Sequence, residues 1–184
     1  MPVAIVHYHL RRGGVTRVIE AQSQALHARG IDHVILAGSS YHGPFDLPGR
    51  VLPDLDSLLG EWPGRGAQLA PTLRETAREA LGEAPLIWHI HNPTLGKNVL
   101  WPALLRTLVN AGDRMVWQYH DFVEDGRPGN YEFIAADPEI YPLAPQIRHA
   151  FINSRDRRFL ISAGVPAHQT AFLPNAVLPP DPPP

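Results

Sequence analysis

The sequence contains no cysteine among its 184 residues, so it can form neither a disulfide bond nor a thiolate metal site. No stretch approaches the roughly 20 consecutive apolar residues that cross a bilayer. Residues 1–6 lack a basic segment followed by a long apolar run, which a signal peptide would show. These absences predict a cytoplasmic protein and leave open a peripheral association with a membrane.

Clustered basic charge is also missing. The 16 Lys and Arg residues are balanced by 18 Asp and Glu residues, and no basic run exceeds two residues, as in Arg11-Arg12 and Arg157-Arg158. Because nucleic-acid binding requires a basic patch, the sequence predicts no nucleic-acid partner. A hydrophobic fraction of 44% with 18% charged residues is typical of a folded globular domain.

Proline, by contrast, is abundant, and it concentrates at the end of the chain. The sequence has 20 prolines, and five of them occupy the last six positions. Such a stretch neither pairs in a sheet nor continues a helix, and it adopts a stiff extended form. We therefore expect one domain over residues 1–177, followed over residues 178–184 by a proline-rich tail or a linker severed from a second domain.

Apolar patterns predict strands that alternate with helices. Short apolar runs rich in β-branched residues predict strands at 3–10, 33–37, 51–52, 86–90, 115–119, 149–152 and 171–173. Helical spacing of apolar residues predicts helices at 15–29, 69–81, 102–109 and 155–163. We expect Pro71 in the first turn of its helix, Ser154 as a helix cap, and a polar loop at 121–130. This order predicts an α/β fold, with a doubly wound parallel sheet covered by helices on both faces.

Ligands of such folds bind beyond the carboxyl ends of the strands. Polar and proton-active residues gather at those predicted positions, whereas the strand interiors are apolar. They are His9, Arg12, Gly13, Gly14, His89, His91, Asn92, His120, Asp121, Asn153 and Ser154. The sequence therefore predicts a binding site along one edge of the sheet.

The pair Gly13-Gly14 follows the first strand and precedes a helix. Without Cβ atoms, backbone amides at such a turn can approach a phosphate or a sugar hydroxyl, toward which the helix directs its positive end. A tight turn with nothing bound would have the same sequence. The pattern is not G-x-G-x-x-G, which disfavours a nicotinamide enzyme.

Two histidine-containing pairs, His91-Asn92 and His120-Asp121, follow later strands. A neutral imidazole can donate or accept a hydrogen bond to a sugar near pH 7. A buried histidine held by loop carbonyls is the structural alternative for each.

The H-x-H pairs His7/His9 and His89/His91 open a different possibility. Residues two apart on a strand share a face, and such pairs can bind zinc in a metal-dependent hydrolase. A barrel built on that motif needs about 250 residues, and apart from Asp121 no carboxylate accompanies these histidines.

Several motifs in sequence order resemble retaining GT-B glycosyltransferases of the "group 1" class. They are residues 6–18, 91–93, 119–122, 151–155 and 164–177. The resemblance implies one half of a GT-B fold: a Rossmann-like N-terminal domain that holds the acceptor and faces a C-terminal domain that binds the nucleotide sugar. It also implies a nucleotide-sugar donor, a sugar or lipid acceptor, and no metal or other cofactor.

The same resemblance assigns expected roles to particular residues. Gly14 would lie against the donor sugar-phosphate region, with Gly13 as a further substrate-binding candidate, and His120 against the donor sugar near the reaction centre. Substrate-binding candidates on the acceptor side are Arg12, Arg17, His91, Asn92 and Asp121. Because the sequence has no counterpart of the donor-binding domain, we expect this chain alone to transfer no sugar. The alternative is a non-catalytic carbohydrate- or partner-binding module.

Overall fold

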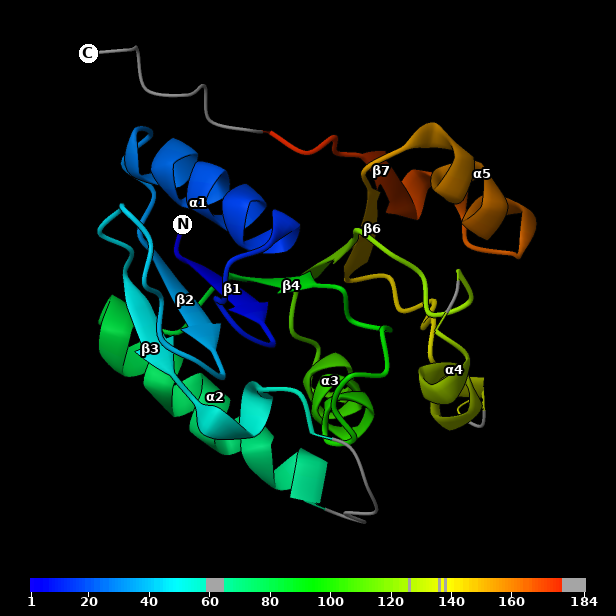
Figure 1. Ribbon diagram of the computed structural model, residues 1–184, viewed down its shortest axis with the longest axis horizontal. Coiled ribbons are helices and arrows are strands. Elements are labelled where there is room, and N and C mark those ends of the chain that lie inside the picture. Colours follow the sequence, from blue (N-terminus) through cyan, green and yellow to red (C-terminus); the bar gives the residue numbers. More distant parts are fainter. Residues whose placement is uncertain (59–64, 126, 136, 138, 177–184) are drawn as a thin grey trace.

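The computed structural model describes residues 1–58, 65–125, 127–135, 137 and 139–176, and these residues form an α/β fold (Figure 1). Seven strands make one sheet, all parallel, in the order β3-β2-β1-β4-β5-β6-β7. The strands are β1 Val3–His7, β2 His33–Ala37, β3 Gly49–Val51, β4 Ile87–His91, β5 Met115–Tyr119, β6 Ile147–Phe151 and β7 Thr170–Phe172. The strand order reverses between β1 and β4, which is where open α/β sheets bind their ligands.

Helices cover both faces of this sheet. They are α1 Gly14–His27, α2 Arg65–Leu81, α3 Trp101–Asn110, α4 Pro128–Ala135 and α5 Ser154–Ser162. Helix α1 covers one face, and α2 and α3 lie side by side on the other (Figure 1). The predicted doubly wound parallel sheet is therefore confirmed. None of these helices, in the described part of the chain, is long and apolar enough to cross a membrane.

The hydrophobic core is divided by the sheet into two layers of unequal size. Beneath α2 and α3, the larger layer includes Leu73, Trp88, Trp101 and Leu104, none of them more than 1% exposed. Beneath α1, the smaller layer contains Ile5, Ile19 and Ile35, among others. Burial of each such side chain contributes about 1.5–3 kcal/mol.

On the face of the sheet that α1 covers, the side chains near the carboxyl ends of the strands are polar. Because side chains alternate along a strand, residues 7, 89, 91 and 118 point to the face covered by α1. Gln22 of α1 donates a hydrogen bond to Gln118 of β5 at 2.8 Å, which confirms that these side chains share that face. The sequence pattern had suggested uniformly apolar strand interiors, and this part of it was wrong.

Four local predictions need correction. The first strand ends at His7, because Tyr8 turns its ring onto Trp101, with ring centroids 4.0 Å apart. Helix α2 begins at Arg65, so Pro71 lies inside the helix and not in its first turn. The loop predicted at 121–130 runs into helix α4, which begins at Pro128.

The fourth correction concerns the cap of α5. Asn153 is the N-cap, and its side-chain oxygen accepts a hydrogen bond from the backbone N–H of Asp156 at 2.8 Å. Ser154 is the first residue of the helix and is not the cap. The predicted tail at 178–184 lies outside the described residues.

Candidate functional site

A cluster of histidines lies at the point where the strand order reverses. His91 ends β4 and is completely buried, and His120 directly follows β5. The Nδ1 atom of His91 lies 2.8 Å from the Nε2 atom of His120, and the two ring planes are nearly parallel, at 17°. His89 stacks on His91 with ring centroids 4.6 Å apart, and His7 lies edge-on to His91 at 6.0 Å. Residues from three strands therefore converge here, as the sequence predicted.

Asn92 connects the end of β4 to the end of β5. Its side-chain oxygen accepts hydrogen bonds from the backbone N–H of His120 at 2.8 Å and of Asp121 at 3.3 Å. Its φ of 53° is the only positive value among the non-glycine residues described. The left-handed conformation costs free energy and is retained where surrounding contacts hold it. The backbone carbonyl of Asn92 also accepts a hydrogen bond from the buried hydroxyl of Tyr8 at 3.1 Å.

The cluster is uncharged at neutral pH. Burial lowers the pKa of His7 to about 3 and the pKa of His120 to about 4. Burial also lowers the pKa of His91 well below its usual value, and the neighbouring imidazoles lower it further. A ring that stays neutral offers one donor and one acceptor to a ligand.

The turn at Gly13 and Gly14 follows β1, the strand that ends with His7. Gly13 is the N-cap of α1, and no side chain caps the helix. A Cβ atom at Gly14 would meet nothing within 4 Å, so the space beside it is open. The first backbone amides of α1 therefore have no side-chain cap, and an anion is favoured at such a helix N-terminus.

A cavity of about 790 Å³ adjoins this turn. Arg12, Gly13 and Arg17 line it together with residues 39–44, which follow β2. Arg17 is held by the buried carboxylate of Glu20 at 2.9 Å, so its charge is balanced. Within the described residues Arg12 makes no ion pair, and it supplies unbalanced positive charge to the cavity.

Another cation, Lys97, lies near the histidine cluster and was not predicted from the sequence. Lys97 is half-buried beside Tyr8, and it is close enough to His7 to lower the pKa of that histidine. Burial lowers the pKa of Lys97 itself, and the charge of Arg127 lowers it further. No periodicity or motif marks Lys97, because only the fold brings it to this edge of the sheet.

The remaining candidate, Asp121, is exposed at the outer side of the site. Its carboxylate lies 3.7 Å from Arg127, which is a weak surface ion pair. The structure thus gathers His91, Asn92, His120 and Asp121 into one group. A second group follows β1 in the chain and consists of Arg12, Gly13, Gly14 and Arg17. His7 and His9, whose ring centroids lie 5.5 Å apart, lead along the chain toward it.

His89 and His91 share one face of β4, and each has one nitrogen atom bound to a protein group, whereas His9 lies beyond the end of β1. His89 Nε2 lies 2.9 Å from the side-chain oxygen of Gln118, and His91 Nδ1 lies against His120. Among the described residues, no group of three His, Asp or Glu side chains is arranged to hold a metal ion.

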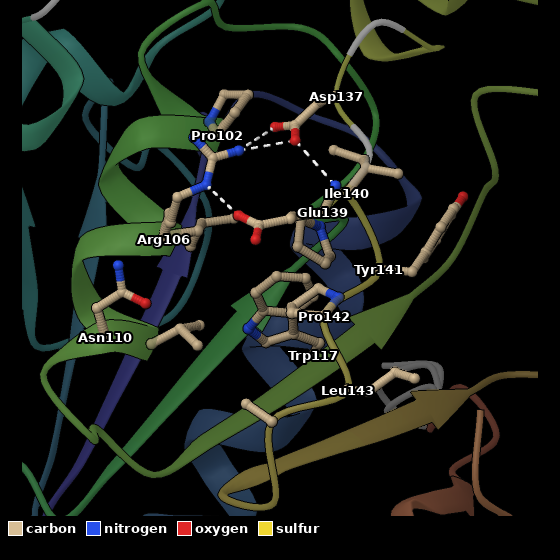
Figure 2. Close-up of a pocket in the computed structure, with 14 residues that line it drawn as sticks. Pro102, Arg106, Asn110, Trp117, Asp137, Glu139, Ile140, Tyr141, Pro142 and Leu143 are labelled. Atoms are coloured by element: carbon tan, nitrogen blue, oxygen red, sulfur yellow. Dashed lines mark hydrogen bonds and ion pairs between the residues drawn. The ribbon is translucent and has the colours of Figure 1, made fainter. Parts of the chain in front are cut away.

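Another cavity, of about 400 Å³, lies on the opposite face between α3 and residues 139–144 (Figure 2). Its charged groups pair with one another: Arg106 binds Asp137 at 2.6 Å and Glu139 at 2.9 Å. The indole nitrogen of Trp117 is enclosed and out of reach of a ligand. This cavity therefore offers little unbalanced polarity, unlike the edge beside Gly13.

The parallel α/β sheet with helices on both faces is consistent with one half of a GT-B fold. Residues 12–178 match the model of Glycosyltransferase Family 4, and the chain belongs to this family. It is 28% identical over 188 aligned positions to mannosylglucosyl-3-phosphoglycerate synthase of Petrotoga mobilis (strain DSM 10674 / SJ95). That alignment covers 94% of this chain but 36% of the relative, so the chain spans about a third of the relative's length.

Proposed function

We propose that this chain is the acceptor-side half of a nucleotide-sugar-dependent glycosyltransferase, and that its working form includes a C-terminal GT-B domain that binds the donor. The observation that carries the proposal is the convergence of His91, Asn92 and His120 beside an uncapped helix N-terminus at the switch point of the sheet. Membership of Glycosyltransferase Family 4 supports it.

The Gly13-Gly14 turn has the properties needed to bind the phosphates of the donor. Its amides have no side-chain cap, and the dipole of α1 favours negative charge there by about 0.3–1 kcal/mol. Arg12 adds positive charge near this turn, and Lys97 adds positive charge near His7. When the bond between sugar and diphosphate breaks, negative charge accumulates on the leaving group, and these donors stabilise it. On this proposal the transfer requires no bound metal or other cofactor.

His120 is proposed to contact the transferred sugar near the bond that breaks. Its position is fixed from two sides, since Asn92 binds its backbone N–H and His91 binds its ring. Precise placement of this kind is how binding energy lowers a reaction barrier. Asp121 and Arg17 lie farther out and are proposed to meet the acceptor.

The acceptor is proposed to be acidic. The cavity beside Gly13 contains the unpaired Arg12, and the charge of Arg17 is already balanced by Glu20. The name of the Petrotoga mobilis relative refers to a phosphoglycerate, which is an acidic compound, and this is consistent with an acidic acceptor for this chain.

The test is a transfer assay with the enzyme that contains this chain, using UDP- and GDP-sugars with neutral sugars, sugar phosphates and lipids as acceptors. We expect transfer to a phosphorylated acceptor, and a loss of about 100-fold or more in kcat for His120→Ala with little change in melting temperature. His168→Ala, at an exposed histidine in the turn before β7, is the matched control. Equal losses of activity and stability for His120→Ala would make that residue structural, and robust transfer by the 184-residue chain alone would refute the need for a second domain.

A further inference from the structure

The hydrogen bond between His91 and His120 fixes where the protons of both rings lie. Burial keeps both rings neutral, so each carries a single N–H. One ring must donate to the other across the 2.8 Å contact between His91 Nδ1 and His120 Nε2. Only two arrangements are possible, and they differ in which nitrogen of His120 holds the proton.

The surroundings of His91 distinguish the two arrangements. Its second nitrogen, Nε2, is enclosed, and in the described part of the chain nothing hydrogen-bonds to it. If His91 accepted from His120, its own proton would lie on Nε2, as a buried donor with no acceptor. Orphaned buried N–H groups are rare and costly, whereas an unfilled lone pair is tolerated more often. His91 therefore carries its proton on Nδ1 and donates it to His120.

Because Nε2 of His120 accepts from His91, the single proton of the neutral His120 ring lies on Nδ1. The side chain of Asn175 lies near this ring.

We propose that His91 is a positioning residue that holds His120 in the Nδ1–H tautomer, so that His120 meets its substrate as a hydrogen-bond donor. The part concerning the substrate rests on the proposed function. It predicts an oxygen acceptor opposite His120, such as a sugar hydroxyl or phosphate oxygen that takes the place of Asn175. It also means that His120 does not act as a general base, because its unprotonated nitrogen is occupied by His91.

The test uses nuclear magnetic resonance of the ¹⁵N-labelled 184-residue chain at pH 7.5, where long-range ¹H–¹⁵N correlations distinguish protonated from unprotonated ring nitrogens. We expect Nδ1 of both His91 and His120 to be protonated. A proton on Nε2 of His120 in the unmodified chain would overturn the proposal.

Two variants separate positioning from folding. His91→Asn keeps an N–H donor near the position of Nδ1, and we expect His120 to remain Nδ1–H. His91→Phe keeps a ring to stack on His89 but removes the donor, and we expect His120 to shift toward Nε2–H, the form that unconstrained neutral imidazoles prefer. An Nδ1–H ring in His91→Phe would show that His91 does not set the tautomer. His149, whose Nδ1 lies 2.8 Å from the Tyr119 hydroxyl, reports in each variant that the fold is intact.

In the working enzyme, His91→Phe should lower kcat by about 100-fold, and His91→Asn should restore most of it. Equal losses in the two variants would contradict the positioning role. The tautomer is measured without any substrate. If the expected tautomers appear in a protein that transfers no sugar, the proposed function fails and the proton placement stands.

Discussion

Acid should destabilise this domain through histidines that are buried uncharged. His7, His91 and His149 are each no more than 3% exposed. Burial lowers the pKa of His7 to about 3 and of His149 to about 4 in the folded chain, from an ordinary value of 6.5. Unfolding exposes these rings, which then take up protons. Their contribution to stability is therefore complete above pH 6.5 and is lost progressively as the pH falls toward 4.

The size of the effect follows from the number of protons taken up. Each proton bound on unfolding changes the free energy of unfolding by about 1.4 kcal/mol per pH unit. His89 and His120, whose pKa values burial also lowers to about 4, join these three, so five histidines set a slope of up to about 7 kcal/mol per pH unit between pH 6 and 5. Since domains of this kind have a total stability of about 5–15 kcal/mol, most of it should be lost by pH 4.5.

Urea denaturation of the 184-residue chain at pH 7, 6, 5.5 and 5 measures this slope. The variant His149→Gln removes one of these five titrating groups and should lower the slope by about a fifth. The control His168→Gln changes an exposed histidine and should leave the slope as it is. A free energy of unfolding that stays constant from pH 7 to 5 would refute the conclusion that these rings are buried uncharged.

Two further predictions concern the backbone of the site. Gly14→Ala should leave the melting temperature unchanged or slightly higher, because a Cβ atom there meets open space, but it should weaken substrate binding. The control is Gly129→Ala, in the first turn of α4, where a Cβ atom also meets open space. This control should change neither the melting temperature nor substrate binding. Equal kinetics for the two glycine variants would show that no ligand approaches Gly14. Asn92→Ala should cost about 3 kcal/mol in urea denaturation, because the N–H groups of His120 and Asp121 lose their acceptor and alanine is strained at a φ of 53°. Asn92→Gly should cost about 1 kcal/mol less, and the opposite order would contradict a role for the left-handed conformation.

The order of strands and helices could be predicted from the sequence because each element carries its own signal. The strand at 33–37 agrees at both ends, and the glycine after α1 has the left-handed φ of 63° expected of a helix stop. Helix α4 was missed because it has hardly any apolar periodicity, and Ile134 is its one buried residue. The cap of α5 was misplaced by one residue because Asn153 and Ser154 are both good capping residues.

The site could be predicted only in outline. Parallel topology brings the carboxyl ends of the strands together, so the gathering of His91 and His120 followed from the strand order alone. Their hydrogen bond depends on the register of β4 against β5, which pairs His91 with Gln118 and which no sequence pattern reveals. Asn175 reaches the site from a part of the chain distant in the sequence, and the position of Lys97 depends on the path of the loop after β4.

The measurement that tests the central claim most directly is a titration of the ¹⁵N-labelled 184-residue chain with UDP-glucose, GDP-mannose and a sugar phosphate, followed through its backbone amide resonances. The account predicts that at least one of these ligands shifts the resonances of Gly13, Gly14, His91 and His120, all at the carboxyl edge of the sheet. Shifts confined to the cavity between α3 and residues 139–144, or no shift with any of the three ligands, would contradict it.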